Sequence, residues 1–156
     1  MNKEIKQTDI IIVGAGPSGC MAANILVDSG RSVILLDKND FPRHKPCAGG
    51  LTPKTVEELP FEITDLKQHD SETMLFKFTN GKTVDLNNES GACKMVVREE
   101  FDEFFFNYVV GKGVEFIRGK VLKIDENTDE VSLETSEYKI KCNFLIGCLL
   151  YTSDAA

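Results

Sequence analysis

The N-terminal part of the chain alternates between short apolar runs and a stretch of helical periodicity. Residues 10–13 and 33–36 are unbroken apolar runs whose length suits a buried strand better than a helix. Between them, residues 18–28 carry apolar side chains at the spacing of one helix face. The pattern therefore predicts a strand, a helix and a second strand that runs parallel to the first.

A glycine-rich turn, residues 14–19, joins the first strand to the helix. Gly14 permits a tight turn, Gly16 allows the backbone to approach a pyrophosphate, and Gly19 allows the helix to pack closely on the strand. Backbone N–H groups at the start of the helix favour a phosphate, and proline is tolerated there. The candidate dinucleotide contacts in the turn are Gly14, Gly16, Pro17, Ser18 and Gly19.

The second predicted strand ends on an acid, Asp37. At the carboxyl end of such a strand, a carboxylate can accept both hydroxyls of a ribose, and it would repel a 2′-phosphate. NADP is therefore disfavoured as the occupant. The alternative is a tight turn without a ligand, but the strand before the turn, the helix after it and the acid favour a dinucleotide site.

A long loop, residues 38–51, follows the acid. Two prolines, two adjacent glycines and a basic triplet exclude a regular element, and ordered loops of this length are usually functional. Gly49 and Gly50 would let the backbone approach a flat ligand, and the Cys47 thiol would lie beside them. A surface loop with solvated charges and an inert cysteine is the other interpretation, and the loop by itself leaves both open.

The remainder of the chain predicts a hairpin, a helix and more strands. An Asn80-Gly81 pair between two alternating segments predicts a type I′ turn. A helix over residues 98–110 carries an apolar stripe that we expect in the core, made of Phe101, Phe104, Phe105, Tyr108 and Val109. The other predicted elements are a helix at 53–59, a connector containing His69, hairpin strands at 73–79 and 83–86, strands at 114–117 and 144–147, and an antiparallel meander at 121–125, 130–135 and 138–142.

Composition narrows the class of function. The chain has 156 residues and a formal net charge of -7, which argues against a nucleic-acid partner and suggests one domain. No apolar run has the length of a membrane span, and the N-terminus has no secretory signal, so we expect a cytoplasmic protein. The five cysteines form no C-x-x-C pair, so we expect reduced thiols and no metal site.

The segment Phe41-Pro42-Arg43-x-Lys45-x-Cys47-x-Gly49-Gly50-Leu51, with the glycine turn and the Asp37-Lys38 pair, resembles the geranylgeranyl reductase family of FAD-dependent oxidoreductases. Ala48 stands where that family commonly has glycine. The family has the para-hydroxybenzoate hydroxylase fold. The resemblance thus implies FAD and an incomplete Rossmann-like α/β domain over residues 1–147, with a β-meander crossover and an inserted antiparallel region at about residues 70–95.

The resemblance also implies roles for single residues. The Cys47–Gly50 loop would lie near the flavin ring, with Cys47 as the candidate for influencing the reacting face, and Arg43 is either an FAD or anion contact or a solvated residue. Arg98 opens its helix against the dipole and matches an FAD-contacting arginine of the family; a solvated or ion-paired arginine is the alternative. The cofactor contacts expected outside the turn are Asp37, Lys38, Arg43, Cys47, Ala48, Gly49, Gly50, Arg98 and, through its backbone, Val121.

Residues 148–156 depart from the family. Its members continue the last strand as Ile-Gly-Ala-Asp-Gly, whose aspartate contacts FAD, whereas Cys148 follows Gly147 here. Residues 148–156 match the translation of a transposase adapter used in sequencing libraries. We therefore expect that the reading frame passes from a gene fragment into adapter sequence and that this segment is non-native.

Together these features predict the N-terminal FAD-binding part of a flavin oxidoreductase. In the intact protein, flavin reduced by NAD(P)H or another donor would deliver hydride to a double bond of an isoprenoid or lipid substrate, with peripheral membrane contact left open. One alternative is an FAD-dependent aromatic hydroxylase of the same fold. Another is that the chain as given is a catalytically inactive fragment.

Overall fold

The computed structural model describes residues 3–87, 91–127 and 130–149. The chain divides into two compact units, one formed by residues 1–43 and 102–156 and the other by residues 44–101. Residues 150–156, which belong to the expected non-native segment, lie outside the described residues.

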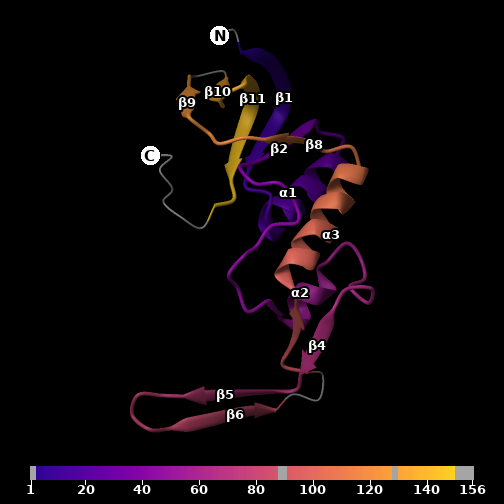
Figure 1. The fold of residues 1–156 in the computed structure, drawn as a ribbon, viewed down its shortest axis with the longest axis vertical. Helices are drawn as coiled ribbons and strands as arrows, with labels where there is room; N and C mark the ends of the chain where they lie inside the picture. Colours follow the sequence, from indigo (N-terminus) through magenta and orange to yellow (C-terminus); the bar gives the residue numbers. More distant parts are fainter. Residues whose placement is uncertain (1–2, 88–90, 128–129, 150–156) are drawn as a thin grey trace. The chain divides into compact units, whose positions relative to one another are not determined.

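A six-stranded sheet forms the first unit, in the order β8-β2-β1-β11-β10-β9 (Figure 1). β1 is parallel to β2 and β11, β2 is parallel to β8, and β10 pairs antiparallel with β9 and β11. A parallel sheet with an antiparallel edge confirms the predicted α/β fold. The strands are β1 (Glu4–Val13), β2 (Val33–Asp37), β8 (Glu115–Arg118), β9 (Lys123–Glu126), β10 (Val131–Glu134) and β11 (Tyr138–Gly147).

The predicted strand-helix-strand unit is present as β1, α1 (Pro17–Asp28) and β2. β2 is buried along its whole length, as its unbroken apolar run predicts for a strand covered on both faces. The register places Val13 beside Leu36, so both strands end at the same edge of the sheet. The glycine turn and Asp37 therefore come together at this edge.

β11 corrects one prediction, because the segments 138–142 and 144–147 are a single strand. Its first part pairs antiparallel with β10, and the strand also runs parallel to β1 from Glu4↔Tyr138 to Val13↔Gly147. The expected break does not occur because β1 begins at Glu4, well before the apolar run, and offers backbone partners to both halves. The buried residues that pack together in this sheet are Ile11, Val13, Ile34, Leu36, Ile117, Leu133, Ile140 and Cys142.

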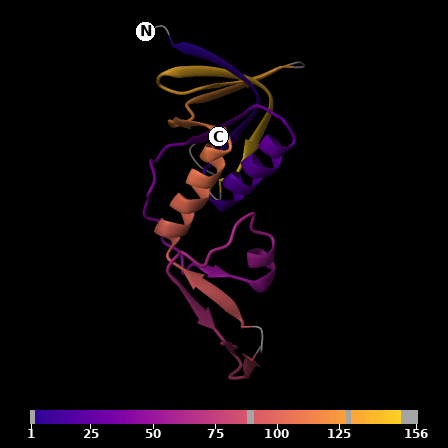
Figure 2. The same cartoon turned by 90° about the vertical axis from the view of Figure 1, so that its right-hand side faces the viewer.

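α3 (Arg98–Gly111) lies beside α1 in both views (Figures 1 and 2). The Lys112 Nζ that follows it donates to Asn24 Oδ1 and to Asp28 Oδ2 on α1, at 2.6 Å each. The predicted apolar stripe is buried at Phe101, Phe105 and Val109 and only partly buried at Phe104 and Tyr108. Among the described residues, no helix is both long and apolar enough to cross a membrane.

A small antiparallel sheet and a helix belong to the second unit. The sheet has the order β3 (Gly50–Leu51), β7 (Cys93–Val96) and β4 (Gln68–Ser71), and the helix is α2 (Pro53–Glu57). His69 lies in β4 opposite Met95, which corrects its expected place in a connector. The Thr52 side chain caps α2 by accepting a hydrogen bond from the Thr55 N–H at 3.2 Å.

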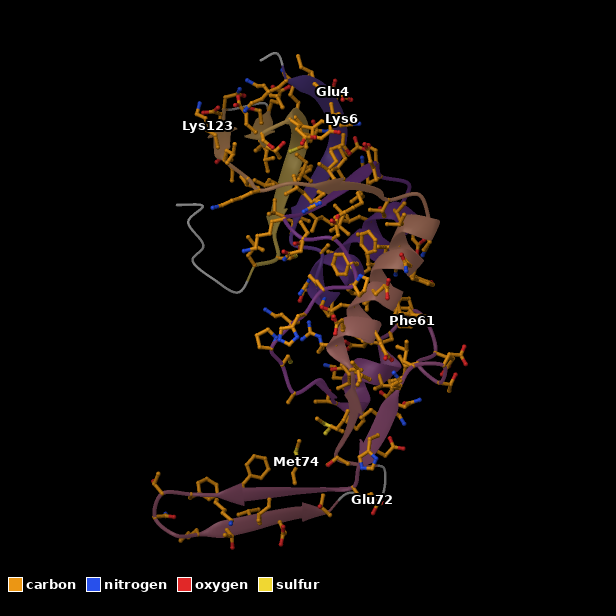
Figure 3. All side chains as sticks on the ribbon, viewed as in Figure 1. Glu4, Lys6, Phe61, Glu72, Met74 and Lys123 are labelled. Atoms are coloured by element: carbon orange, nitrogen blue, oxygen red, sulfur yellow. The ribbon has the colours of Figure 1, made fainter. Side chains whose placement is uncertain are left out.

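The hairpin of β5 (Thr73–Lys77) and β6 (Thr83–Asn87) is present, but its turn is not type I′. That turn needs a positive φ at Asn80 as well as at Gly81, and only Gly81 has one, at +80°. The Gly81 N–H donates to the Phe78 carbonyl at 3.0 Å, and the Phe78 N–H donates to the Lys82 carbonyl at 2.9 Å. These bonds define a three-residue loop with a left-handed glycine. Figure 3 shows the Met74 side chain projecting from β5.

Candidate dinucleotide site

The glycine turn closes on the end of β2 through two hydrogen bonds that its backbone N–H groups donate. Gly14 has a φ of +106°, and its N–H donates to the Leu36 carbonyl at 2.7 Å. The Ala15 N–H donates to Asp37 Oδ2 at 2.9 Å. The carboxylate predicted to bind a ribose thus also fixes the shape of the turn, a role that sequence reasoning missed.

Asp37 is buried and has a second backbone partner. Its Oδ1 accepts a hydrogen bond from the Asn39 N–H at 3.0 Å, and the residue is 9% exposed. A carboxylate oxygen can accept more than one hydrogen bond, so both oxygens keep capacity for further donors. The arrangement therefore leaves Asp37 able to accept ribose hydroxyls while it holds the turn.

The helix begins directly after the turn, with Gly16 as its N-cap and Pro17 in its first turn. The N-cap makes no side-chain hydrogen bond, which leaves backbone N–H groups at this end for an anion. A Cβ on Gly19 would collide with the Gly14 carbonyl oxygen and lie 3.5 Å from Ile12 Cγ2. Only glycine therefore allows α1 to pack this closely on the turn, as predicted from the motif.

The guanidinium of Arg43 lies beside Gly16 of the glycine turn. A Cβ on Gly16 would be 3.3 Å from Arg43 Nη2, a contact tighter than is usual for a Cβ. Arg43 Nη2 also forms an ion pair with Asp102 Oδ2 at 3.2 Å, and the two side chains are 13% and 0% exposed. The structure thus brings together Arg43 and the glycine turn, two elements that the sequence suggested separately.

Sequence reasoning did not predict that Asp102 takes part in the site. The structure shows that it is a buried ion-pair partner, 1% exposed. The signal that could have revealed this is its position: Asp102 lies beside Phe101 and one helical turn before Phe105, on the apolar side of the helix. A carboxylate on such a face is rarely buried without a partner.

Aromatic rings support the arginine. The Arg43 guanidinium carbon lies 5.1 Å from the centroid of the Phe41 ring, a cation–π distance. Phe41 stacks on Phe106 with a centroid separation of 4.5 Å, and Phe106 meets Phe116 edge-on at 4.7 Å. The Arg43 guanidinium therefore contacts both the Phe41 ring and the Asp102 carboxylate.

Cys20 is the buried thiol of this region. Its Sγ donates to the Ala15 carbonyl at 3.4 Å. Burial, reinforced by the negative charge of Asp102, raises the pKa of the Cys20 thiol to about 12. The side chain is therefore a neutral packing group at neutral pH, and not a nucleophile.

The predicted flavin-ring loop belongs to the second unit. Gly49 has a φ of +76°, and a Cβ there would collide with the Val96 carbonyl oxygen, so glycine is needed by the packing of the loop on β7. The Val96 N–H donates to the Gly49 carbonyl at 2.9 Å. Cys47 is exposed, and its Sγ accepts a hydrogen bond from the Gly49 N–H at 3.5 Å. These contacts account for Gly49 without a flat ligand.

The other predicted contacts are distributed over both units. Lys38 and Ala48 are exposed, and Arg98 is the first residue of α3. Val121 is half-buried and packs against the core of the sheet. Their roles toward a cofactor remain predictions.

The chain that follows β11 lies against the glycine turn. The Cys148 N–H donates to the Val13 carbonyl at 2.8 Å, and a Cβ on Gly14 would be 2.7 Å from the Cys148 carbonyl oxygen. This is the stretch in which the resemblance expects an FAD-contacting aspartate, and the sequence has Cys148-Leu149 there.

Comparison with known proteins gives the family. The chain belongs to the FAD-binding domain family, which it matches over residues 7–149. An uncharacterized protein of Methanosarcina barkeri is 36% identical over 144 residues, which cover 92% of this chain and 37% of that protein. The geranylgeranyl diphosphate reductase of Rhodobacter capsulatus is 32% identical over 127 residues, which cover 77% and 30% of the two chains. The rifampicin monooxygenase of Rhodococcus hoagii is 28% identical over 149 residues, which cover 90% and 31%.

Solved structures show the same fold. A geranylgeranyl bacteriochlorophyll reductase-like protein from Thermoplasma acidophilum superposes with a TM-score of 0.83 at 15% identity, covering 97% of this chain and 41% of that one. Halogenase PltM, in complex with phloroglucinol and FAD, has a TM-score of 0.72 at 18% identity and covers 91% and 34%. The chain therefore spans about a third of the length of the curated relatives that it matches.

The geometry of the turn fits the cofactor of this family. The turn presents backbone without side chains at Gly14, Gly16 and Gly19, which is the surface that a diphosphate needs. Arg43 Nε is buried and has no hydrogen-bond partner among the described residues, which is the condition expected of a donor whose acceptor is a ligand. Both observations agree with a site for the diphosphate of FAD.

Proposed function

We propose that the whole protein containing this chain is an FAD-dependent oxidoreductase that reduces carbon–carbon double bonds of an isoprenoid substrate. The observation that carries the proposal is the glycine turn hydrogen-bonded to Asp37, in a chain that is 32% identical to a geranylgeranyl diphosphate reductase. The resemblance of the Phe41–Leu51 segment to geranylgeranyl reductases supports the same reaction.

In this proposal the residues of the turn bind and orient the cofactor. The glycine backbone and the N-terminus of α1 hold the diphosphate, because no side chain intervenes and the helix dipole favours negative charge. Asp37 accepts the hydroxyls of the adenosine ribose through its remaining lone pairs. Lys38, Arg98, Val121 and the Cys47–Gly50 loop are candidate contacts on the resemblance alone.

When bound and reduced, FAD would supply the redox chemistry, namely the hydride equivalent that, together with a proton, saturates one double bond. NAD(P)H or another donor would return the electrons. The contribution of this chain is to hold the dinucleotide end of FAD in a fixed position, so that the reacting ring is presented reproducibly to the substrate.

An anaerobic half-reaction tests the proposal. The flavin of the whole protein is reduced photochemically and mixed with geranylgeranyl diphosphate, and the flavin absorbance and the product mass are followed. We expect reoxidation of the flavin and a product heavier by two hydrogens for each reduced double bond. No reoxidation by any isoprenoid diphosphate, quinone or chlorophyll side chain would contradict the proposed substrate class.

A flavin hydroxylase is the second candidate, favoured by the 28% identity to rifampicin monooxygenase. The two reactions differ in their need for oxygen. NADPH oxidation that depends on an aromatic substrate and consumes oxygen would identify a hydroxylase, and reoxidation of the flavin by substrate without oxygen would identify a reductase. The same assays on residues 1–156 alone test the third interpretation, that this chain is catalytically inactive by itself.

A further inference from the structure

Asp102 is a buried carboxylate whose presence stability alone does not explain. Taking a carboxylate and a guanidinium out of water costs free energy that their attraction only partly offsets, so a buried ion pair is often no more stable than apolar residues in the same place. The neighbourhood of Asp102 would suit an apolar side chain, since Phe101, Phe105 and Val109 on the same helix are all buried. The pair with Arg43 therefore calls for another explanation.

The position of Arg43 suggests what the pair does. Its Nη2 is held by Asp102 at 3.2 Å and lies beside the position of a Gly16 Cβ, and the Phe41 ring supports the guanidinium at 5.1 Å. The ion pair with Asp102 and the contact with the Phe41 ring thus fix the Arg43 guanidinium at the glycine turn. A guanidinium has five N–H donors, and the buried Nε of Arg43 has no partner among the described residues.

We propose that Asp102 is a positioning residue that holds the Arg43 guanidinium at the glycine turn, where Arg43 binds the diphosphate of the dinucleotide. The inference rests on the proposed binding of FAD and adds a named charge pair to it. Arginine suits this task because its rigid fork of donors matches phosphate oxygens, whereas an unpaired guanidinium on a loop would have to be ordered on binding.

The geometry also gives Gly16 a second role. A Cβ at Gly16 would be 3.3 Å from Arg43 Nη2, so a side chain there would push the guanidinium away from the turn as well as block a diphosphate. The glycine, the arginine and the acid thus act as one unit. Changing any one of them should weaken binding of the diphosphate and leave binding of the nucleoside part unaffected.

The experiment measures dissociation constants of FAD, ADP and adenosine for the whole protein stripped of flavin, by flavin fluorescence and by calorimetry. The variants are Asp102→Asn and Arg43→Gln, together with the double variant that carries both. We expect each single variant to bind FAD and ADP about tenfold more weakly, or worse, because a charge-assisted hydrogen bond is lost or misplaced. Adenosine should bind as it does to the unmodified protein.

The double variant isolates positioning from direct contact. If Asp102 acts through Arg43, adding Asp102→Asn to Arg43→Gln should weaken ADP binding no further. Asp102→Asn alone leaves a buried guanidinium unpaired and can fail to fold; the double variant removes both charges and retains the test in that case. Arg43→Lys should recover only part of the affinity, since lysine lacks the fork of donors.

An exposed pair in the same unit provides the matched control. Arg118 Nη1 lies 2.7 Å from Asp40 Oδ2, with side chains 65% and 61% exposed, so Arg118→Gln removes an arginine–aspartate pair without touching the buried one. It should bind all three ligands unchanged. Equal weakening of ADP and adenosine by Asp102→Asn, or additive losses in the double variant, would overturn the inference. Failure of the unmodified protein to bind FAD would instead overturn the proposed function.

Discussion

The Gly19→Ala substitution would place a methyl group between α1 and the glycine turn. The added Cβ would collide with the Gly14 carbonyl oxygen and lie 3.0 Å from the Gly14 carbonyl carbon. Both are backbone atoms, so no flexible side chain can move aside, and either the helix or the turn must shift. The same shift would displace the backbone N–H groups proposed to bind the diphosphate.

Two opposing effects set the size of the change. Overpacking costs typically about 1–3 kcal/mol, and more where backbone must move, while alanine in place of glycine favours a helix by roughly 0.5–1 kcal/mol. We expect a net loss of about 1–2 kcal/mol in the free energy of unfolding. FAD should bind at least about tenfold more weakly, which corresponds to roughly 1.4 kcal/mol.

Urea unfolding followed by circular dichroism gives the first quantity, and titration with FAD gives the second. Gly111→Ala is the matched control, because Gly111 lies at the end of α3, has no atom within 4 Å of its would-be Cβ and has no positive φ. It should leave FAD binding unchanged and raise stability by up to about 1 kcal/mol. A Gly19→Ala protein as stable as the unmodified one, with unchanged affinity for FAD, would show that the close packing of α1 on the turn does not require glycine.

Three further predictions concern other parts of the chain. Cys20 should resist iodoacetamide in the folded protein at pH 8 while exposed Cys47 reacts, and mass spectrometry of the alkylated peptides would show the difference. Because burial raises the Cys20 pKa from 9.0 to about 12, the contribution of the neutral thiol to stability should be complete below pH 9 and be lost as the pH rises toward 12. Fast alkylation of Cys20 at pH 8 would contradict this prediction. Asp37→Ala should lower the free energy of unfolding by about 1–3 kcal/mol, because two backbone N–H donors lose their acceptor. Asp37→Asn keeps one acceptor oxygen and should lower it less. Equal losses for the two variants in urea unfolding would show that these bonds do not stabilise the turn. Gly49→Ala should destabilise the fold by several kcal/mol, because a clash with the backbone of β7 adds to a strained φ. Gly81→Ala has the same strained φ but no neighbouring atom within 4 Å, and it should cost only about 1 kcal/mol. Similar melting temperatures for the two variants would rule out the clash.

The sequence predicts the parts of the fold whose signals are local. Unbroken apolar runs predicted β2 and the last four residues of β1 (Glu4–Val13), and the glycine spacing predicted the turn, because strand burial and tight packing restrict residue type at each position. The hairpin was found but its turn type was not, since Asn80-Gly81 fits both a two-residue type I′ loop and a three-residue loop ending in a left-handed glycine. The choice between these loops depends on strand register, which involves residues of both strands.

The candidate site was predictable where a residue belongs to a motif of fixed local spacing. The need for glycine at Gly19 follows from the motif, but the pairing of Arg43 with Asp102 joins segments far apart in the chain and leaves no spacing to read. Gly49 was interpreted as room for a ligand, and the structure adds a second reason for glycine there, because the packing of the loop on β7 already requires it. A local sequence pattern can therefore show that a position needs glycine, but it does not show which contact in the folded protein imposes that need.

The identity of the cofactor released from the whole protein tests the proposed FAD site most directly. The protein is purified without added cofactor, denatured, and the supernatant is analysed by chromatography with absorbance detection and mass spectrometry. We expect FAD in an amount equimolar with the protein, or restored to that amount by incubation with FAD. A colourless protein that takes up no FAD, or one that retains FMN or a nicotinamide dinucleotide instead, would contradict it.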